Sequence, residues 1–126
     1  MEIIPAIDIL NNIVVQAKGG KRKNYKPLKS QMFNSNSLED VIRIFLKEYN
    51  FKKFYIADLN SITKKNHNYA IIKKTIKKFP KIDFWIDYGI TTYEDFERFK
   101  LDKCTLVLGS ETLKSSDELR KIISRK

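Results

Sequence analysis

Three aspartates and a glycine–serine pair stand where the apolar segments of this 126-residue chain end, and they are its best candidates for chemistry. Asp8 lies near the end of "IIPAIDI", Asp58 follows "FYIA", and Asp87 follows "DFWI". Gly109 and Ser110 close the segment "CTLVLGS". Carboxylates bind polar groups of a ligand or exchange protons with them, and a glycine lets a backbone N–H come close to a phosphate. These residue types predict a ligand site with an anion-binding turn.

Strands and helices are predicted to alternate along the chain. The predicted strands are continuous apolar runs, as in parallel strands covered on both faces, at 2–9, 52–59, 82–88 and 104–110. The predicted helices carry apolar stripes at helical spacing, over 38–49, about 68–79, from 91 or 92, and from 115 or 116. Strand–helix alternation repeated four times predicts an α/β fold with a parallel sheet. The long connection 11–37 interrupts it, and its "IVVQA" part can add a short strand.

The carboxyl ends of parallel strands face the ligand-binding crevice of α/β folds. Asp8, Asp58, Asp87 and the Gly109–Ser110 pair are therefore expected to converge on one rim. Gly89 follows the third predicted strand, leads into a helix start, and can share a phosphate with the Gly109 turn.

Each of these residues also has a structural interpretation. An aspartate after a strand often caps the following loop through local hydrogen bonds. For Asp8 the two interpretations carry equal weight, whereas for Asp58 and Asp87 capping is slightly favoured. The Gly109–Ser110 pair can equally be turn chemistry. Three further residues are expected to be structural, namely His67 on a surface loop, Cys104 as a buried filler and Trp85 in core or barrel packing.

The length and composition of the chain predict a single domain, residues 1–126, in a cytoplasmic protein. Apolar residues make up 42% of the chain, it has one cysteine, and no run is long enough to span a bilayer. The net charge of +10 comes from scattered lysines and only five arginines, which disfavours nucleic acid as a partner. No spacing typical of a metal site or a cofactor motif is present, so none is expected.

Several motifs together resemble a known family. "IIPAIDILNNIVVQAKGG" resembles the opening of the phosphoribosylformimino-AICAR ribotide isomerase family, the HisA/HisF-type TIM barrels, and "FYIADLNS" and "TLVLGSETL" resemble their second and fourth strands. The similarity is greater still to an uncharacterised HisA-related subgroup with Gly-x-Arg-x-x-Tyr-x-Pro after the first strand. In this chain, that pattern falls on Gly20, Arg22, Tyr25 and Pro27.

The resemblance implies a parallel (βα)4 half of a TIM barrel and an isomerase of the Amadori type, which converts an aminoaldose into an aminoketose. It gives Asp8 the role of catalytic acid/base. It implies a phosphorylated substrate, over which the basic loop 18–26 would close. The substrate-binding residues that it implies or that would line its pocket are Gly20, Arg22, Asp58, Asp87, Gly89, Gly109 and Ser110.

The chain departs from the isomerases in two ways. Asp87 and Tyr88 stand where the family has glycines, and they would repel a phosphate and narrow its seat, which disfavours the histidine-pathway substrate. The strand-five aspartate of the isomerases is absent, and a half barrel has exposed sheet edges. We therefore expect a homodimer, a complementary half-barrel chain or a truncation. The alternative function is a non-catalytic, phosphate-binding half-barrel subunit.

Overall fold

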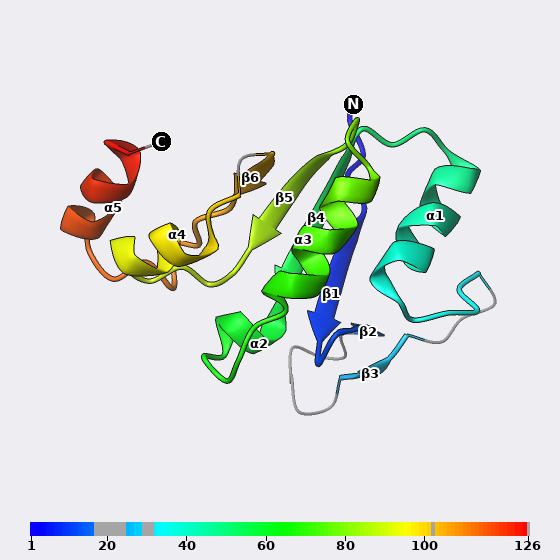
Figure 1. Ribbon diagram of the computed structural model, residues 1–126, viewed down its shortest axis with the longest axis horizontal. Helices are drawn as coiled ribbons and strands as arrows, with labels where there is room; N and C mark the ends of the chain where they lie inside the picture. Colours follow the sequence, from blue (N-terminus) through cyan, green and yellow to red (C-terminus); the bar gives the residue numbers. More distant parts are fainter. Residues whose placement is uncertain (17–24, 29–31, 102, 126) are drawn as a thin grey trace.

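Six strands form one open sheet, in the order β3-β2-β1-β4-β5-β6 (Figure 1). The computed structural model describes residues 1–16, 25–28, 32–101 and 103–125. The strands are β1 Ala6–Leu10, β2 Ile13–Gln16, β3 Lys26–Pro27, β4 Lys53–Asp58, β5 Asp83–Asp87 and β6 Cys104–Leu106. Strands β1, β4, β5 and β6 are parallel, whereas β2 pairs antiparallel with β1 and β3 pairs antiparallel with β2. The predicted parallel sheet is therefore confirmed.

The helices follow the strands as the alternation predicts. They are α1 Leu38–Glu48, α2 Leu59–Ile62, α3 Tyr69–Lys78, α4 Tyr93–Phe99 and α5 Ser116–Ile123. Ser37, Thr92 and Ser115 cap α1, α4 and α5 by accepting hydrogen bonds from N–H groups in the first turn, which fixes where these helices begin. The sequence pattern did not predict the short helix α2. None of the described helices is long and apolar enough to cross a membrane.

Within the "IVVQA" segment, Ile13–Gln16 form strand β2, and a tight hairpin turn joins it to β1. Asn11 and Asn12 form the turn with φ angles of 53° and 68°, a conformation that asparagine tolerates better than most residues. The backbone N–H of Asn11 donates to Oδ1 of Asn60, and that of Asn12 donates to Oδ1 of Asn68, both at 2.7 Å. These bonds tie the hairpin to the region that follows β4.

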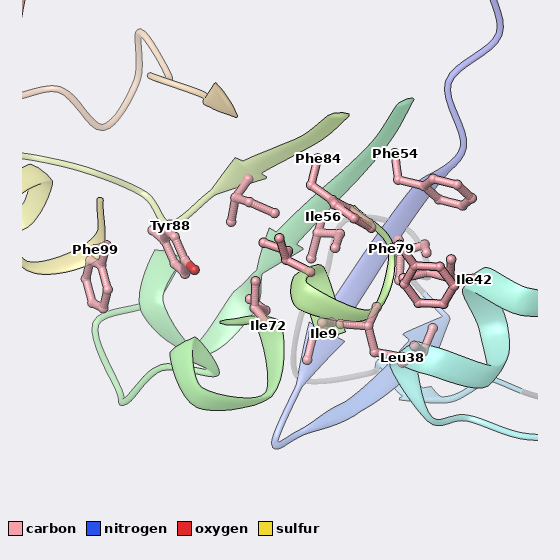
Figure 2. Close-up of a cluster of buried hydrophobic side chains, with 14 of the residues drawn as sticks. Ile9, Leu38, Ile42, Phe54, Ile56, Ile72, Phe79, Phe84, Tyr88 and Phe99 are labelled. Carbon is pink, nitrogen blue, oxygen red and sulfur yellow. The ribbon is translucent and has the colours of Figure 1, made fainter. Parts of the chain in front are cut away.

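The main core lies on one face of the sheet, where α1 and α3 cover it (Figures 1 and 2). Phe54, Ile56, Phe84 and Ile86 alternate along β4 and β5 and are 0% exposed. Tyr55 and Trp85 alternate with them, point to the other face and are only half-buried. The prediction of strands covered on both faces holds only in part. The helices α1 and α3 pack on the first face, whereas a smaller cluster of Val15, Ala57 and Leu59 buries part of the second.

The four βα units in a mostly parallel, unclosed sheet are a partial TIM barrel, as the sequence predicts. The observed strands are shorter than predicted. The first begins at Ala6 rather than residue 2, and the last ends at Leu106 rather than residue 110. Residues 107–110 run on past the carboxyl end of β6 into the turn that carries Gly109.

Candidate functional site

Asp8 and Asp87 lie on the same row of the sheet, with Ala57 between them. Asp8 is paired with Ala57 across β1 and β4, and Ala57 is paired with Asp87 across β4 and β5. Residues paired in a sheet point to the same face, so both carboxylates extend from the face opposite α1 and α3. Two strand spacings separate their Cα atoms by about 10 Å. Asp87 is also the last residue of β5, which places the row at the carboxyl end of that strand.

Tyr55 lies on the same face, one row below, and reaches the carboxylate of Asp87. Its hydroxyl donates a hydrogen bond of 2.9 Å to Oδ2 of Asp87. Burial and this hydrogen bond, then the negative charges of Asp87, Asp8 and Glu111, raise the pKa of Tyr55 far above its usual value. Tyr55 therefore stays a neutral phenol beside three carboxylates. Sequence reasoning missed Tyr55 and Glu111, although the two-residue spacing from Tyr55 to Ala57 does place Tyr55 on this face.

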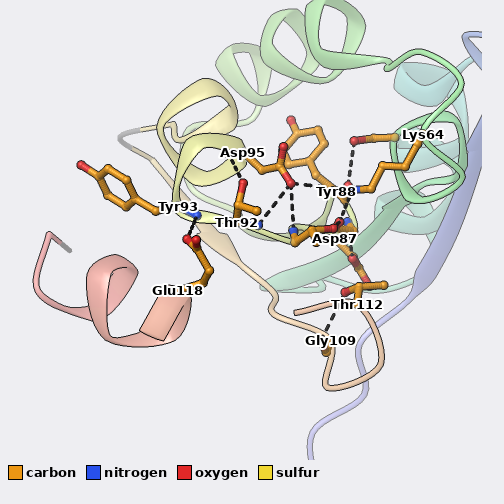
Figure 3. Close-up of polar contacts among 12 residues, drawn as sticks. Lys64, Asp87, Tyr88, Thr92, Tyr93, Asp95, Gly109, Thr112 and Glu118 are labelled. Carbon is orange, nitrogen blue, oxygen red and sulfur yellow. Dashed lines mark hydrogen bonds and ion pairs between the residues drawn. The ribbon is translucent and has the colours of Figure 1, made fainter. Parts of the chain in front are cut away.

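Gly89 turns the chain after β5 and holds Asp87 in place. Figure 3 shows Asp87 and Lys64, the two side chains that contact this turn. Its φ is +64°, and a Cβ at this position would lie 2.7 Å from Cα of Ile62, so only glycine fits without strain. Its N–H donates to Oδ1 of Asp87 at 2.9 Å, and its carbonyl accepts from Nζ of Lys64 at 2.5 Å. The backbone N–H that was expected to meet a phosphate is therefore directed at a carboxylate.

Gly109 lies at the same pole of the sheet, because β6 runs parallel to β5 and Leu106 is paired with Ile86. Its carbonyl accepts hydrogen bonds from the N–H groups of Thr112 and Leu113, at 3.2 and 3.1 Å. The carboxylate of Glu111 folds back so that a Cβ on Gly109 would lie 3.0 Å from it. Ser110 is exposed beside this turn. The structure thus brings Asp8, Asp87, Gly89, Gly109 and Ser110 to one pole.

Asp58 does not join that group. It is 0% exposed, and its carboxylate accepts hydrogen bonds from the N–H of Ser61 at 3.0 Å and from both the N–H and the side-chain amide of Asn68 at 2.6 Å. It follows Ala57 in β4, so alternation turns it to the opposite face. Asp58 was expected to line the pocket, and this expectation is wrong. Its carboxylate caps the turn after β4 instead, because protein atoms surround it completely and no ligand can reach it.

Tyr88 also faces inward. It is 0% exposed and stacks on Phe99 with ring centroids 4.7 Å apart and an interplanar angle of 17°. Tyr88 was expected to narrow a phosphate seat at the rim, and this expectation is wrong, since the residue after Asp87 points to the core (Figure 2).

The amino-terminal part of the second face is polar as well. Asp83 accepts hydrogen bonds from the indole N–H of Trp85 at 2.8 Å and from the hydroxyl of Thr105 at 2.9 Å. The ammonium of Lys53 lies 5.3 Å from the centre of the Trp85 ring. Trp85 is therefore a residue of this polar face and not of the main core. These contacts involve the opposite end of β5 from Asp87.

Of the other predicted residues, Gly20 and Arg22 lie outside the described residues, as does most of the basic loop. Within the described ranges, no group of three histidine, cysteine, aspartate or glutamate side chains could hold a metal ion. His67 is half-buried rather than fully on the surface, and its ring lies edge-on to Phe99 at 5.4 Å. Cys104 is half-buried, and burial raises the pKa of its thiol to about 11.

Parallel βα units that carry acidic side chains at the carboxyl ends of their strands define this chain as a TIM-barrel type of protein in which four units are present. The model of the family described as "Histidine biosynthesis protein" matches residues 2–126, and the chain belongs to that family. It is also 39% identical, over 123 residues, to the uncharacterised protein MJ0703 of Methanocaldococcus jannaschii. The match covers 95% of this chain and 52% of that relative, so the chain spans about half the relative's length.

Proposed function

We propose that this chain supplies the acid/base half of an isomerase of the Amadori type, acting on an aminoaldose phosphate. The observation that carries the proposal is the position of Asp8, on the open face of the sheet in one row with Asp87. A carboxylate at the carboxyl-terminal pole of a barrel strand is placed to exchange a proton with a bound sugar. Membership of the histidine biosynthesis family supports the same reaction class.

The phosphate of the substrate is proposed to rest on the turn after β6. The N–H of Gly89 is engaged by Asp87, which leaves Gly109 and Ser110 as the better seat among the described residues. Glu111 lies against Gly109 and would have to swing away, as an exposed glutamate on a turn can do. In this proposal Gly20 and Arg22 would close over the phosphate from the basic loop.

The experiment is an isomerase assay of the purified chain with phosphoribosylformimino-AICAR ribotide as the probe. Turnover by the wild type that falls at least about 100-fold in Asp8→Asn supports the proposal, since general acid–base groups contribute about that much. Asp83→Asn is the matched control, because Asp83 lies on the same sheet face at the opposite pole. If the chain forms the homodimer, a wild type without turnover would contradict the proposal, and so would an Asp8→Asn variant with full turnover.

The second candidate is a non-catalytic half-barrel subunit that binds a phosphorylated molecule. The observation that favours it is the exposed turn of Gly109 and Ser110 after β6, which can seat a phosphate whether or not the chain turns a substrate over. Binding of the same ribotide in calorimetry, without turnover, would support this candidate.

Completion of the sheet by further polypeptide is part of both proposals. The outer side of β6 is an open edge among the described residues, and open edges are normally paired or covered. We propose a second copy or a complementary half-barrel chain as the partner. A solution mass near twice 14.9 kDa would support the homodimer, whereas a monomeric mass at micromolar concentration would leave only the complementary chain.

A further inference from the structure

We propose that Asp87 is the second acid/base group of the site and that Tyr55 is the residue that positions it. This inference rests on the proposed isomerase function. It differs from the sequence-based expectation, in which Asp87 only lines the pocket and the second acid comes from a strand beyond this chain. Two observations support this assignment. Asp87 shares a row of the sheet with Asp8, and hydrogen bonds fix both of its carboxylate oxygens.

The reaction needs two proton-transferring groups. First, the C1–O bond of the sugar ring breaks and an acid gives a proton to the ring oxygen, which leaves an iminium ion at C1. A base then takes the proton from C2, and the electron pair forms a C1=C2 bond that neutralises the iminium. Finally, the protonated base gives its proton to C1 and the 2-hydroxyl gives its proton to the ionised acid, which yields the aminoketose and restores both groups. The protons balance, and no oxidant or reductant is required.

Asp87 is built to accept a proton in that sequence. Oδ1 accepts from the N–H of Gly89 and Oδ2 accepts from the hydroxyl of Tyr55, both at 2.9 Å. A carboxylate has about four acceptor sites on its two oxygens, and these two hydrogen bonds occupy one site on each oxygen. Each oxygen keeps a further lone pair for a substrate proton. We therefore assign Asp87 the removal of the C2 proton and assign Asp8, entering the reaction in its protonated form, the proton given to the ring oxygen.

The supports of Asp87 are rigid. Gly89 cannot shift easily, because its α-carbon packs against Ile62 and its carbonyl accepts from Lys64. Tyr55 extends from the neighbouring strand, and both Asp8 and Asp87 lie close enough to act on its hydroxyl. A carboxylate held from two sides in this way keeps its geometry during the reaction, which is what a general base requires.

The simple structural alternative is that Asp87 only caps the turn to Gly89. Asparagine can still accept the Gly89 hydrogen bond through its amide oxygen, so Asp87→Asn separates the two roles. We expect Asp87→Asn to lower kcat about 100-fold or more with KM nearly unchanged. It should also abolish exchange of the C2 proton of the ribotide with D2O, followed by NMR. Tyr55→Phe should lower kcat about tenfold and keep the exchange, since the base remains but loses one support.

Asp83→Asn is the matched control, because Asp83 is on the same strand and face and also accepts two side-chain hydrogen bonds. Its kcat should stay within about twofold of the wild type, and thermal unfolding of each variant would verify that it folds. C2 exchange at the wild-type rate in Asp87→Asn would overturn the inference while leaving the isomerase proposal intact. A wild-type homodimer that neither turns over nor exchanges the ribotide would overturn both.

Discussion

The hydroxyl of Tyr55 and the carboxylate of Asp87 are joined by a 2.9 Å hydrogen bond between neighbouring parallel strands, on the sheet face that α1 and α3 leave open. This bond links the middle of β4 to the carboxyl end of β5. The half-buried Tyr55 is thereby held close to negatively charged side chains. The fully buried Tyr88 lies on the other side of the sheet, between the aromatic rings of Tyr69 and Phe99. These two environments raise the pKa of both tyrosines and so affect the stability of the fold.

Folding stability should fall at alkaline pH. Burial raises the pKa of Tyr88, and burial together with Asp87 raises that of Tyr55. The unfolded chain loses these protons near the usual tyrosine value of about 10, before the folded chain does, so rising pH favours the unfolded state. The stabilisation is complete below about pH 10 and is lost progressively above it. Urea unfolding at about pH 8 and pH 11 measures the loss.

Tyr55→Phe and Tyr88→Phe should each make that alkaline decline shallower. Tyr49→Phe is the control, because Tyr49 is 66% exposed. If the free energy of unfolding of Tyr88→Phe fell with pH as steeply as that of the wild type, the raised pKa of Tyr88 would be contradicted.

Tyr88→Phe should also stabilise the protein at neutral pH. Among the described residues, the hydroxyl of Tyr88 is a buried polar atom without a hydrogen-bond partner, and such a group costs about 1–3 kcal/mol. Phenylalanine keeps the ring that stacks on Phe99 and removes the hydroxyl. We expect the free energy of unfolding to rise by about 1 kcal/mol. A loss of stability in urea titration would show that the hydroxyl is in fact hydrogen-bonded.

Asp58→Ala should be the most damaging of the aspartate substitutions for folding. It removes the acceptor of three hydrogen bonds, so the buried backbone N–H groups of Ser61 and Asn68 lose this acceptor, while the side-chain amide of Asn68 keeps its hydrogen bond to Asn60. We expect a loss of about 3 kcal/mol, at the upper end for hydrogen bonds to a charged group. Asp117→Ala, at a carboxylate that is 80% exposed, should change stability by less than about 0.5 kcal/mol. Equal effects of the two substitutions would rule out a capping role for Asp58.

The two glycines at the site should respond differently to alanine. Gly89→Ala places a Cβ 2.7 Å from the backbone of Ile62 at a positive φ, so we expect it to cost about 2 kcal/mol or more. Gly109→Ala meets only the end of the Glu111 side chain, which can turn away, and should cost less than about 1 kcal/mol. Comparing the urea midpoints of the two variants is the measurement. A larger loss from Gly109→Ala would contradict the geometry of the Gly89 turn.

The helix boundaries could be predicted from the sequence because their signals are local. Ser37, Thr92 and Ser115 each accept a hydrogen bond from a residue three positions later, and apolar residues at helical spacing mark the buried side. The parallel sheet could be predicted too, since strand–helix alternation leaves few other arrangements. The predicted strand ends were less accurate, because the sequence does not distinguish an apolar residue just outside the hydrogen-bonded sheet from one inside it.

The four βα units, and the residues near the carboxyl ends of their strands, could be read from the amino-acid sequence. Which of those residues share a sheet face depends on the three-dimensional fold. Asp58 and Asp87 occur in similar contexts, after apolar runs, yet strand register turns Asp87 to the open face beside Tyr55 and turns Asp58 into a buried polar network. The reason is physical. Side chains alternate between faces with every residue, so a one-residue difference in strand register reverses a carboxylate's surroundings, and register depends on long-range pairing between strands.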